Sequence, residues 1–187
     1  MQIEIRSSPS QATLAAADHL TRLLSSTATK TLMIAAGNTP LGLYAEIARR
    51  GLPLEHLDVF ILDEYVGVPL EHPRTCASIL RREVQEAWRI PEKRFHAISS
   101  LERGALENVL AHEGRINTLG GLDVIVLGLG QNGHLGFNEP VSSPDSTARV
   151  IDLEPVSVEA NRKWFGGEHA PQKGATIGLK TILSAKH

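Results

Sequence analysis

The sequence predicts an α/β domain with a mainly parallel sheet flanked by helices. Three near-continuous apolar runs, at 31–36, 58–62 and 123–127, are typical of strands covered on both faces. Stretches with apolar residues at helical spacing lie between them, and this alternation favours a parallel sheet. The chain has 187 residues, 42% of them hydrophobic, which is enough to bury a core of its own. We therefore expect a single α/β catalytic domain over 1–187.

Start and stop signals define the other elements. Ser8 and Pro9 form a typical N-cap and first helical residue, and apolar residues at helical spacing continue to about residue 25. Thr39 and Pro40 repeat the pattern and predict a second helix. The remaining expected elements are helices at 75–88, 101–119, 157–165 and 178–183 and short strands at 2–5, 94–98, 150–153 and 175–178.

Composition excludes several classes of protein. Nineteen Lys and Arg balance 21 Asp and Glu, and aromatic residues make up only 4%, so no nucleic-acid partner is expected. The absence of a long apolar stretch and the polar N-terminus predict no membrane span and a cytoplasmic protein. The single cysteine, Cys76, excludes an internal disulfide framework and a cysteine-based zinc site. No His, Asp and Glu set has ligand spacing, so no metal is expected.

Three polar loops follow the predicted strands. They lie at 37–39, 63–65 and 128–140, each directly after an apolar run. In open α/β sheets, ligands bind at the carboxyl ends of the strands. We therefore expect these loops to form one site.

The segment 128–133 (GLGQNG) matches the glycine pattern of dinucleotide-binding loops, and Asp152 lies about 20 residues further on. Such a loop must open a helix that faces the pyrophosphate. Here two prolines and a glycine follow within the next residues and leave no room for that helix. No nicotinamide or flavin dinucleotide is therefore expected, and the chemistry that we infer needs no cofactor.

Acid–base chemistry is the better interpretation of these loops. His134 and Glu139 share the third loop with Asn132, and a carboxylate near a histidine can fix its tautomer. The alternative is that they only tie down a glycine-rich loop. Asp63 follows four apolar residues, where partial desolvation raises a carboxyl pKa towards that of a useful base, although it could equally be a cap.

An anion site is expected at the first loop. Gly37, Asn38 and Thr39 precede a helix, where backbone N–H groups and a hydroxyl bind phosphate, although a plain capped turn would look the same. An anion anchor, a carboxylate base and a histidine together suit proton transfer on a small phosphorylated metabolite.

The segments 62–67 (LDEYVG) and 128–140 (GLGQNGHLGFNEP) resemble the glucosamine-6-phosphate deaminase (isomerase) family. The resemblance implies a Rossmann-like fold shared with 6-phosphogluconolactonases and conversion of glucosamine 6-phosphate and water to fructose 6-phosphate and ammonia. It implies that His134 assists opening of the sugar ring and that Glu139 and Asn132 orient the His134 side chain. It also implies that Asp63 is the base that moves a proton from C2 to C1 of the sugar. The phosphate would bind at 37–39, and the partner would be a small phosphorylated amino sugar.

The chain departs from the family pattern at three places. Asn132 cannot share a positive charge with the histidine as an Asp would, and Asn38 replaces a usual glycine. Lys163 falls where a substrate-binding Arg is expected, and Lys lacks the bidentate fork, although an exposed surface Lys would look the same. The residues around Cys76 and the segment 178–183 resemble the galactosamine-6-phosphate branch, which leaves the C4 stereochemistry open.

Two other functions remain open, namely a lactone hydrolase that uses His134 as general base on water and a non-catalytic sugar-phosphate sensor. The segment 137–140 (FNEP) disfavours the hydrolase. The sequence leaves a homo-oligomer open. Arg149 and Ser142–Ser143 lie where some members of the resembled family bind an allosteric amino-sugar phosphate, but an ordinary surface loop is the favoured interpretation. Relatives continue beyond the segment 178–183, so the domain is expected to be incomplete at its C-terminus.

Overall fold

The computed structural model describes residues 3–130 and 132–187. Two sheets form its centre. The first is parallel, with strand order β4-β2-β1-β5, and the second is antiparallel, with strand order β3-β7-β6. The strands are β1 (Thr31–Ile34), β2 (Asp58–Ile61), β3 (Asp63–Val66), β4 (Phe95–His96), β5 (Val124–Val126), β6 (Arg149–Asp152) and β7 (Lys173–Thr176). The α/β class is therefore confirmed, with a separate antiparallel sheet added to the expected parallel one.

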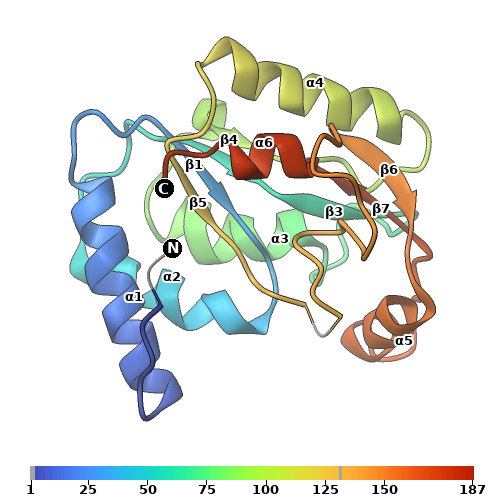
Figure 1. The fold of residues 1–187 in the computed structure, drawn as a ribbon, viewed down its shortest axis with the longest axis horizontal. Coiled ribbons are helices and arrows are strands. Elements are labelled where there is room, and N and C mark those ends of the chain that lie inside the picture. The colour runs from blue at the N-terminus through green and yellow to red at the C-terminus, as the bar shows by residue number, and fades with distance from the viewer. Residues whose placement is uncertain (1–2, 131) are drawn as a thin grey trace.

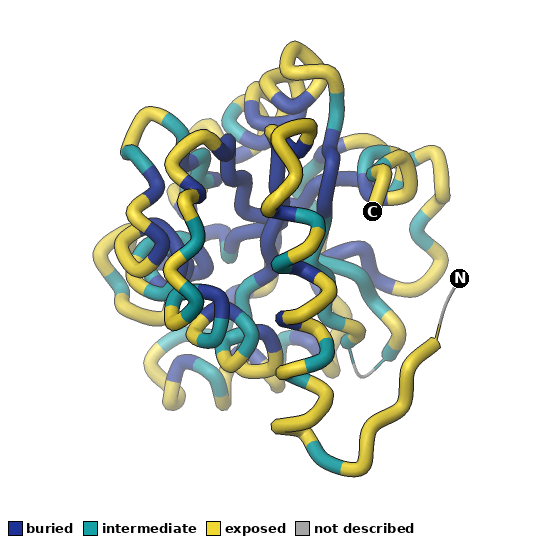
Figure 2. The backbone as a smooth tube through the Cα atoms, turned by 90° about the vertical axis from the view of Figure 1, so that its left-hand side faces the viewer, coloured by how far each residue is buried: buried dark blue, intermediate teal, exposed yellow. Residues whose placement is uncertain are grey.

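The helices cover the strands on both faces. They are α1 (Pro9–Leu24), α2 (Asn38–Arg50), α3 (Cys76–Leu80), α4 (Ala105–Thr118), α5 (Pro155–Trp164) and α6 (Leu179–Leu183). In Figure 1, α4 and α6 lie above the strands and α2 and α3 below them, while α5 lies at the far end beside the antiparallel sheet. All residues of β1 and β2 are buried because helices cover both faces. Figure 2 shows this buried centre within an exposed outer layer.

Leu62 marks the change from one sheet to the other. Its N–H donates to the carbonyl of Ile34 at 3.0 Å, and its carbonyl accepts from the N–H of Ile177 at 3.1 Å. Asp63 therefore begins β3, whereas the sequence suggests that it lies in a loop after the strand. The residues that follow a buried strand are here placed at the junction of two sheets.

Several expected bounds are corrected by the structure. The segment 3–5 is not part of a strand, since Ile3 and Ile5 are exposed, and Gln2 lies outside the described residues. The helix expected at 75–88 is α3 followed by a π-helical segment, Arg81–Glu86. The helix expected at 101–119 begins only at Ala105, after Gly104 with its positive φ of 80°.

Candidate functional site

The three polar segments at 37–39, 63–65 and 128–140 meet in one cavity of about 370 Å³ at the carboxyl ends of β1, β2 and β5. From the expected site, the lining includes Gly37, Asn38 and Thr39 at the start of α2, Asp63 at the start of β3, and His134. Asn132 and Glu139 lie behind His134 and do not line the cavity, and neither does Lys163. Seven of the eight expected site residues, all except Lys163, thus lie in or directly behind the wall of one cavity.

Asp63 is buried at the floor of this cavity, with 8% of its surface exposed. Burial disfavours the charged carboxylate and raises the pKa of Asp63 to about 7. A carboxyl group with this pKa is present in both protonation states near neutral pH, so it can accept a proton and return it. The sequence predicts a raised pKa here because Asp63 ends an apolar run.

Glu64, next to Asp63, is a buried carboxyl group that the sequence analysis did not single out. Its carboxylate accepts the backbone N–H groups of Tyr65 and Cys76 at 2.8 and 3.0 Å and that of Ala77 at 2.8 Å. Burial nevertheless raises its pKa to about 7, and the negative charge of Asp63 adds to this. Glu64 therefore ties the start of α3 to β3 beside the cavity. No local sequence signal tells which of the two adjacent carboxyl groups, Asp63 or Glu64, lines the cavity and which one accepts the N–H groups of α3.

The third loop presents His134 to the cavity and holds Glu139 behind it. The Asn132 amide donates to Oε2 of Glu139 at 2.7 Å, and the backbone N–H of His134 donates to Oδ1 of Asn132 at 3.3 Å. Nδ1 of His134 lies 3.7 Å from Oε2 of Glu139 and is buried without a hydrogen-bond partner among the described residues. A small rotation of the imidazole would bring the two atoms into hydrogen-bond distance.

Glu139 remains a carboxylate because its partners outweigh burial. Burial raises its pKa, but the neighbouring Ser157 hydroxyl, the hydrogen bonds from Asn132 and from the backbone N–H of Glu154, and the charge of His134 give a net lowering. Asn132 thus orients the carboxylate, and the carboxylate faces His134.

Gly130 does not have the role that the corresponding glycine has in a dinucleotide-binding loop. A side-chain carbon at Gly130 would overlap the imidazole of His134. Among the described residues 132–148, no helix follows β5. The glycine therefore leaves room for the histidine, and the helix that a pyrophosphate requires is missing from this part of the chain.

The start of α2 is an uncapped helix N-terminus at the cavity wall. The N-cap is Gly37, with φ 112°, and it provides no side-chain hydrogen bond to the first turn. This corrects the expectation that Thr39 is the cap and Pro40 the first helical residue. The N–H groups of the first turn are thus left for a ligand, and the helix dipole favours an anion there.

Helix α5 closes one side of the cavity through Asn161 and Trp164. Lys163, on the same helix, points away, with 77% of its side chain exposed and its Nζ 3.7 Å from Oε1 of Glu159. The cavity is instead lined by Arg74, which the sequence analysis did not select. Its guanidinium donates to the carbonyl of Trp164, and the indole N–H of Trp164 donates back to the Arg74 carbonyl at 2.9 Å.

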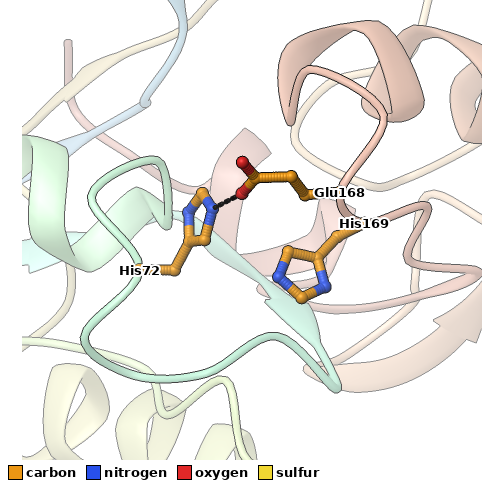
Figure 3. Close-up of side chains that lie close together, drawn as sticks. All are labelled: His72, Glu168 and His169. Carbon is orange, nitrogen blue, oxygen red and sulfur yellow. Dashed lines mark hydrogen bonds and ion pairs between the residues drawn. The ribbon is translucent and has the colours of Figure 1, made fainter.

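A second contact joins the same loop to the segment that follows α5. His72, Glu168 and His169 place possible ligand atoms within 4.8 Å of one another, and Nε2 of His72 lies 3.3 Å from Glu168 (Figure 3). The backbone N–H of Arg74 donates to Nδ1 of His72 at 3.2 Å, so the neutral ring carries its proton on Nε2. That proton faces the carboxylate, whereas a metal would need the nitrogen lone pair. The cluster is therefore a hydrogen-bonded contact.

Arg149 and Ser142 do meet, since Nη2 of Arg149 donates to the Ser142 hydroxyl at 3.0 Å.

Within the described part of the chain, the helices are too short or too polar to span a bilayer.

Comparisons with known proteins identify the family of this chain. A family model described as glucosamine-6-phosphate isomerases/6-phosphogluconolactonase matches residues 7–149. The glucosamine-6-phosphate deaminase of Corynebacterium kroppenstedtii is 40% identical over 192 residues, which cover 100% of this chain and 74% of that protein.

Solved structures show the same fold. One is described as a monomeric glucosamine-6-phosphate deaminase, a missing link of the NagB superfamily. It matches with a TM-score of 0.94 and 26% sequence identity, and the match covers 100% of this chain and 80% of that chain. The 6-phosphogluconolactonase of Trypanosoma cruzi matches with a TM-score of 0.78 and 20% identity over 100% and 77%, a likeness in fold alone. The chain belongs to the glucosamine-6-phosphate isomerase/6-phosphogluconolactonase family.

Proposed function

We propose that this chain converts glucosamine 6-phosphate and water to fructose 6-phosphate and ammonia. The observation that carries the proposal is a buried carboxyl group with a pKa of about 7, Asp63, which shares one cavity with His134 and the uncapped start of α2. The reaction needs a base, a proton carrier and a phosphate anchor, and this cavity offers all three. The deaminase from Corynebacterium kroppenstedtii, 40% identical, supports the choice of substrate.

His134 opens the sugar ring in this proposal. It takes the proton of the anomeric hydroxyl and delivers a proton to the ring oxygen, which breaks the bond between C1 and that oxygen. Glu139 lies 3.7 Å from its Nδ1 and stabilises the imidazolium formed in between. Asn132 holds Glu139 in place through the 2.7 Å hydrogen bond.

Asp63 then moves a proton between neighbouring carbons. As a carboxylate it removes the proton from C2 of the open-chain sugar, which gives an enolamine, and it returns the proton to C1. Water hydrolyses the resulting imine at C2, and ammonia leaves as the ketone forms. A pKa of about 7 suits both halves of this transfer, because neither the acid nor the base form is strongly favoured.

The phosphate anchor lies at the other side of the cavity. The free N–H groups at the start of α2 and the hydroxyl of Thr39 would hold the phosphate of the substrate. The sugar then extends towards Asp63 and His134 across the same cavity.

The test is ammonia release by the purified chain from glucosamine 6-phosphate, followed with a coupled dehydrogenase. The unmodified chain should release ammonia, and Asp63→Asn and His134→Gln should each lose at least a hundredfold in kcat. Asp152→Asn is the matched control, because this aspartate is exposed and, among the described residues, forms an ion pair only with Lys173. No ammonia from either the gluco or the galacto substrate would exclude the proposal.

The galacto substrate belongs in the same assay because the segments around Cys76 and at 178–183 resemble the galactosamine branch. Hydrolysis of 6-phosphogluconolactone without ammonia release would instead favour a lactone hydrolase. Calorimetric binding of the sugar phosphate without turnover would favour a sensor.

A further inference from the structure

One positive side chain stands out at the candidate site. Among the described residues that line the cavity, Arg74 is the only Arg or Lys. The expected cation, Lys163, is exposed and faces Glu159 instead. A phosphate dianion held only by backbone N–H groups would leave much of its charge uncompensated, so the identity of the facing cation matters for substrate choice.

Arg74 lies on the same side of the cavity as the start of α2. A second, outer hollow shares both Asn38 and Arg74 with the cavity, together with Trp164. Arg74 and the α2 N-terminus therefore form parts of one wall. Lys163 and Arg82 line the outer hollow only.

Trp164 holds the Arg74 side chain in this wall. The guanidinium donates through Nη1 to the Trp164 carbonyl, and the indole N–H donates to the Arg74 carbonyl at 2.9 Å. The remaining guanidinium nitrogens make no hydrogen bond to the described residues. A fixed guanidinium with unused donors beside a helix N-terminus suits an oxyanion, because Arg can bind two phosphate oxygens at once.

We propose that Arg74 is the cation that binds the substrate phosphate, and that Trp164 is the residue that positions it. The inference rests on the proposed function for the identity of the sugar, but it specifies which group of that substrate is recognised and by which residue. Since the phosphate does not react, Arg74 binds the ground state and the transition state alike, and its loss raises KM more than it lowers kcat.

The first test compares Arg74→Gln with Lys163→Gln and Arg82→Gln. Arg74→Gln should raise KM for glucosamine 6-phosphate roughly 10- to 100-fold, the range for a charge-assisted contact, with kcat within about threefold. Lys163→Gln tests the rival cation, and Arg82→Gln is the control for loss of one positive charge at the outer hollow. Both should keep KM within about twofold.

The second test does not depend on turnover. Binding of inorganic phosphate, measured by tryptophan fluorescence, should weaken by the same factor in Arg74→Gln. Trp164→Phe removes the indole N–H, so it should raise KM by a smaller factor, and adding phosphate should inhibit it less than the unmodified chain. Arg74→Lys keeps the charge without the fork and should be intermediate, and it serves in place of Arg74→Gln if that variant does not fold.

The outcomes separate this inference from the proposed function. If the unmodified chain releases no ammonia but Arg74→Gln still weakens phosphate binding, the function is wrong and the role of Arg74 stands. If the unmodified chain releases ammonia and Arg74→Gln changes neither KM nor phosphate binding by more than twofold, the role of Arg74 is overturned. A KM increase in Lys163→Gln alone would overturn it as well.

Discussion

Replacing Asp63 with Asn should make the protein more stable and inactive at the same time. The carboxyl group is buried, and its charged form is disfavoured in the folded state. Asn has nearly the same shape and carries no charge. The substitution therefore removes the cost of ionising a buried acid, and with it the proposed base.

The size of the gain follows from the shift in pKa. A rise from 3.8 to about 7 is about three pKa units, and at 1.36 kcal/mol per unit the ionised group destabilises the fold by roughly 4 kcal/mol. Because the folded state holds the proton more tightly, the stability of the unmodified chain falls as pH rises from about 4 to 7 and is constant above. The advantage of Asp63→Asn should be roughly 4 kcal/mol at pH 8 and less than about 2 kcal/mol at pH 5.

Urea unfolding at pH 5 and pH 8 measures this difference, with Asp152→Asn as the control that shifts neither curve. The ammonia assay on the same samples should show a loss of at least about a hundredfold in kcat. The reasoning is refuted if Asp63→Asn is no more stable, relative to the unmodified chain, at pH 8 than at pH 5. Turnover within tenfold of the unmodified chain would remove Asp63 from the reaction.

Two further substitutions and one titration test other parts of the structure. Glu64→Ala leaves three backbone N–H groups without their acceptor and should destabilise the fold by about 2–4 kcal/mol in urea unfolding, whereas Asp152→Asn should not. His112 is buried, and burial lowers its pKa to about 4. Its NMR signals should therefore not titrate between pH 8 and 5. The stability that neutral His112 contributes should be lost as pH falls from about 6.5 to 4, because the unfolded chain binds the proton first. Gly130→Ala would push the His134 ring out of place and should lower kcat about 10- to 100-fold, with little change in the unfolding midpoint; unchanged kcat would contradict the role given to this glycine.

The sequence predicts the parts of the fold that depend on local pattern. Continuous apolar runs identify β1, β2 and β5, and the polar residues that follow them meet at one cavity because parallel strands end at the same edge. Asp63 is predicted with a raised pKa for the same reason. These features follow from which residues are apolar and in what order they occur.

Other features depend on contacts between distant segments, and no local pattern contains them. Asp63 begins a strand because Leu62 bonds both to Ile34 of β1 and to Ile177, which directly follows β7 of the other sheet. Arg74 reaches the cavity because Trp164, 90 residues away, binds its loop. The direction of Lys163 is likewise set by the packing of α5, so its place in a family pattern does not bring it to the cavity.

The most direct test of the account is the ammonia released when the purified chain is given glucosamine 6-phosphate at pH 7 to 8. The account predicts ammonia and fructose 6-phosphate in equal amounts, with both lost in Asp63→Asn and retained in Asp152→Asn. Ammonia release that persists in Asp63→Asn, or a folded chain that binds the substrate and releases none, would contradict it.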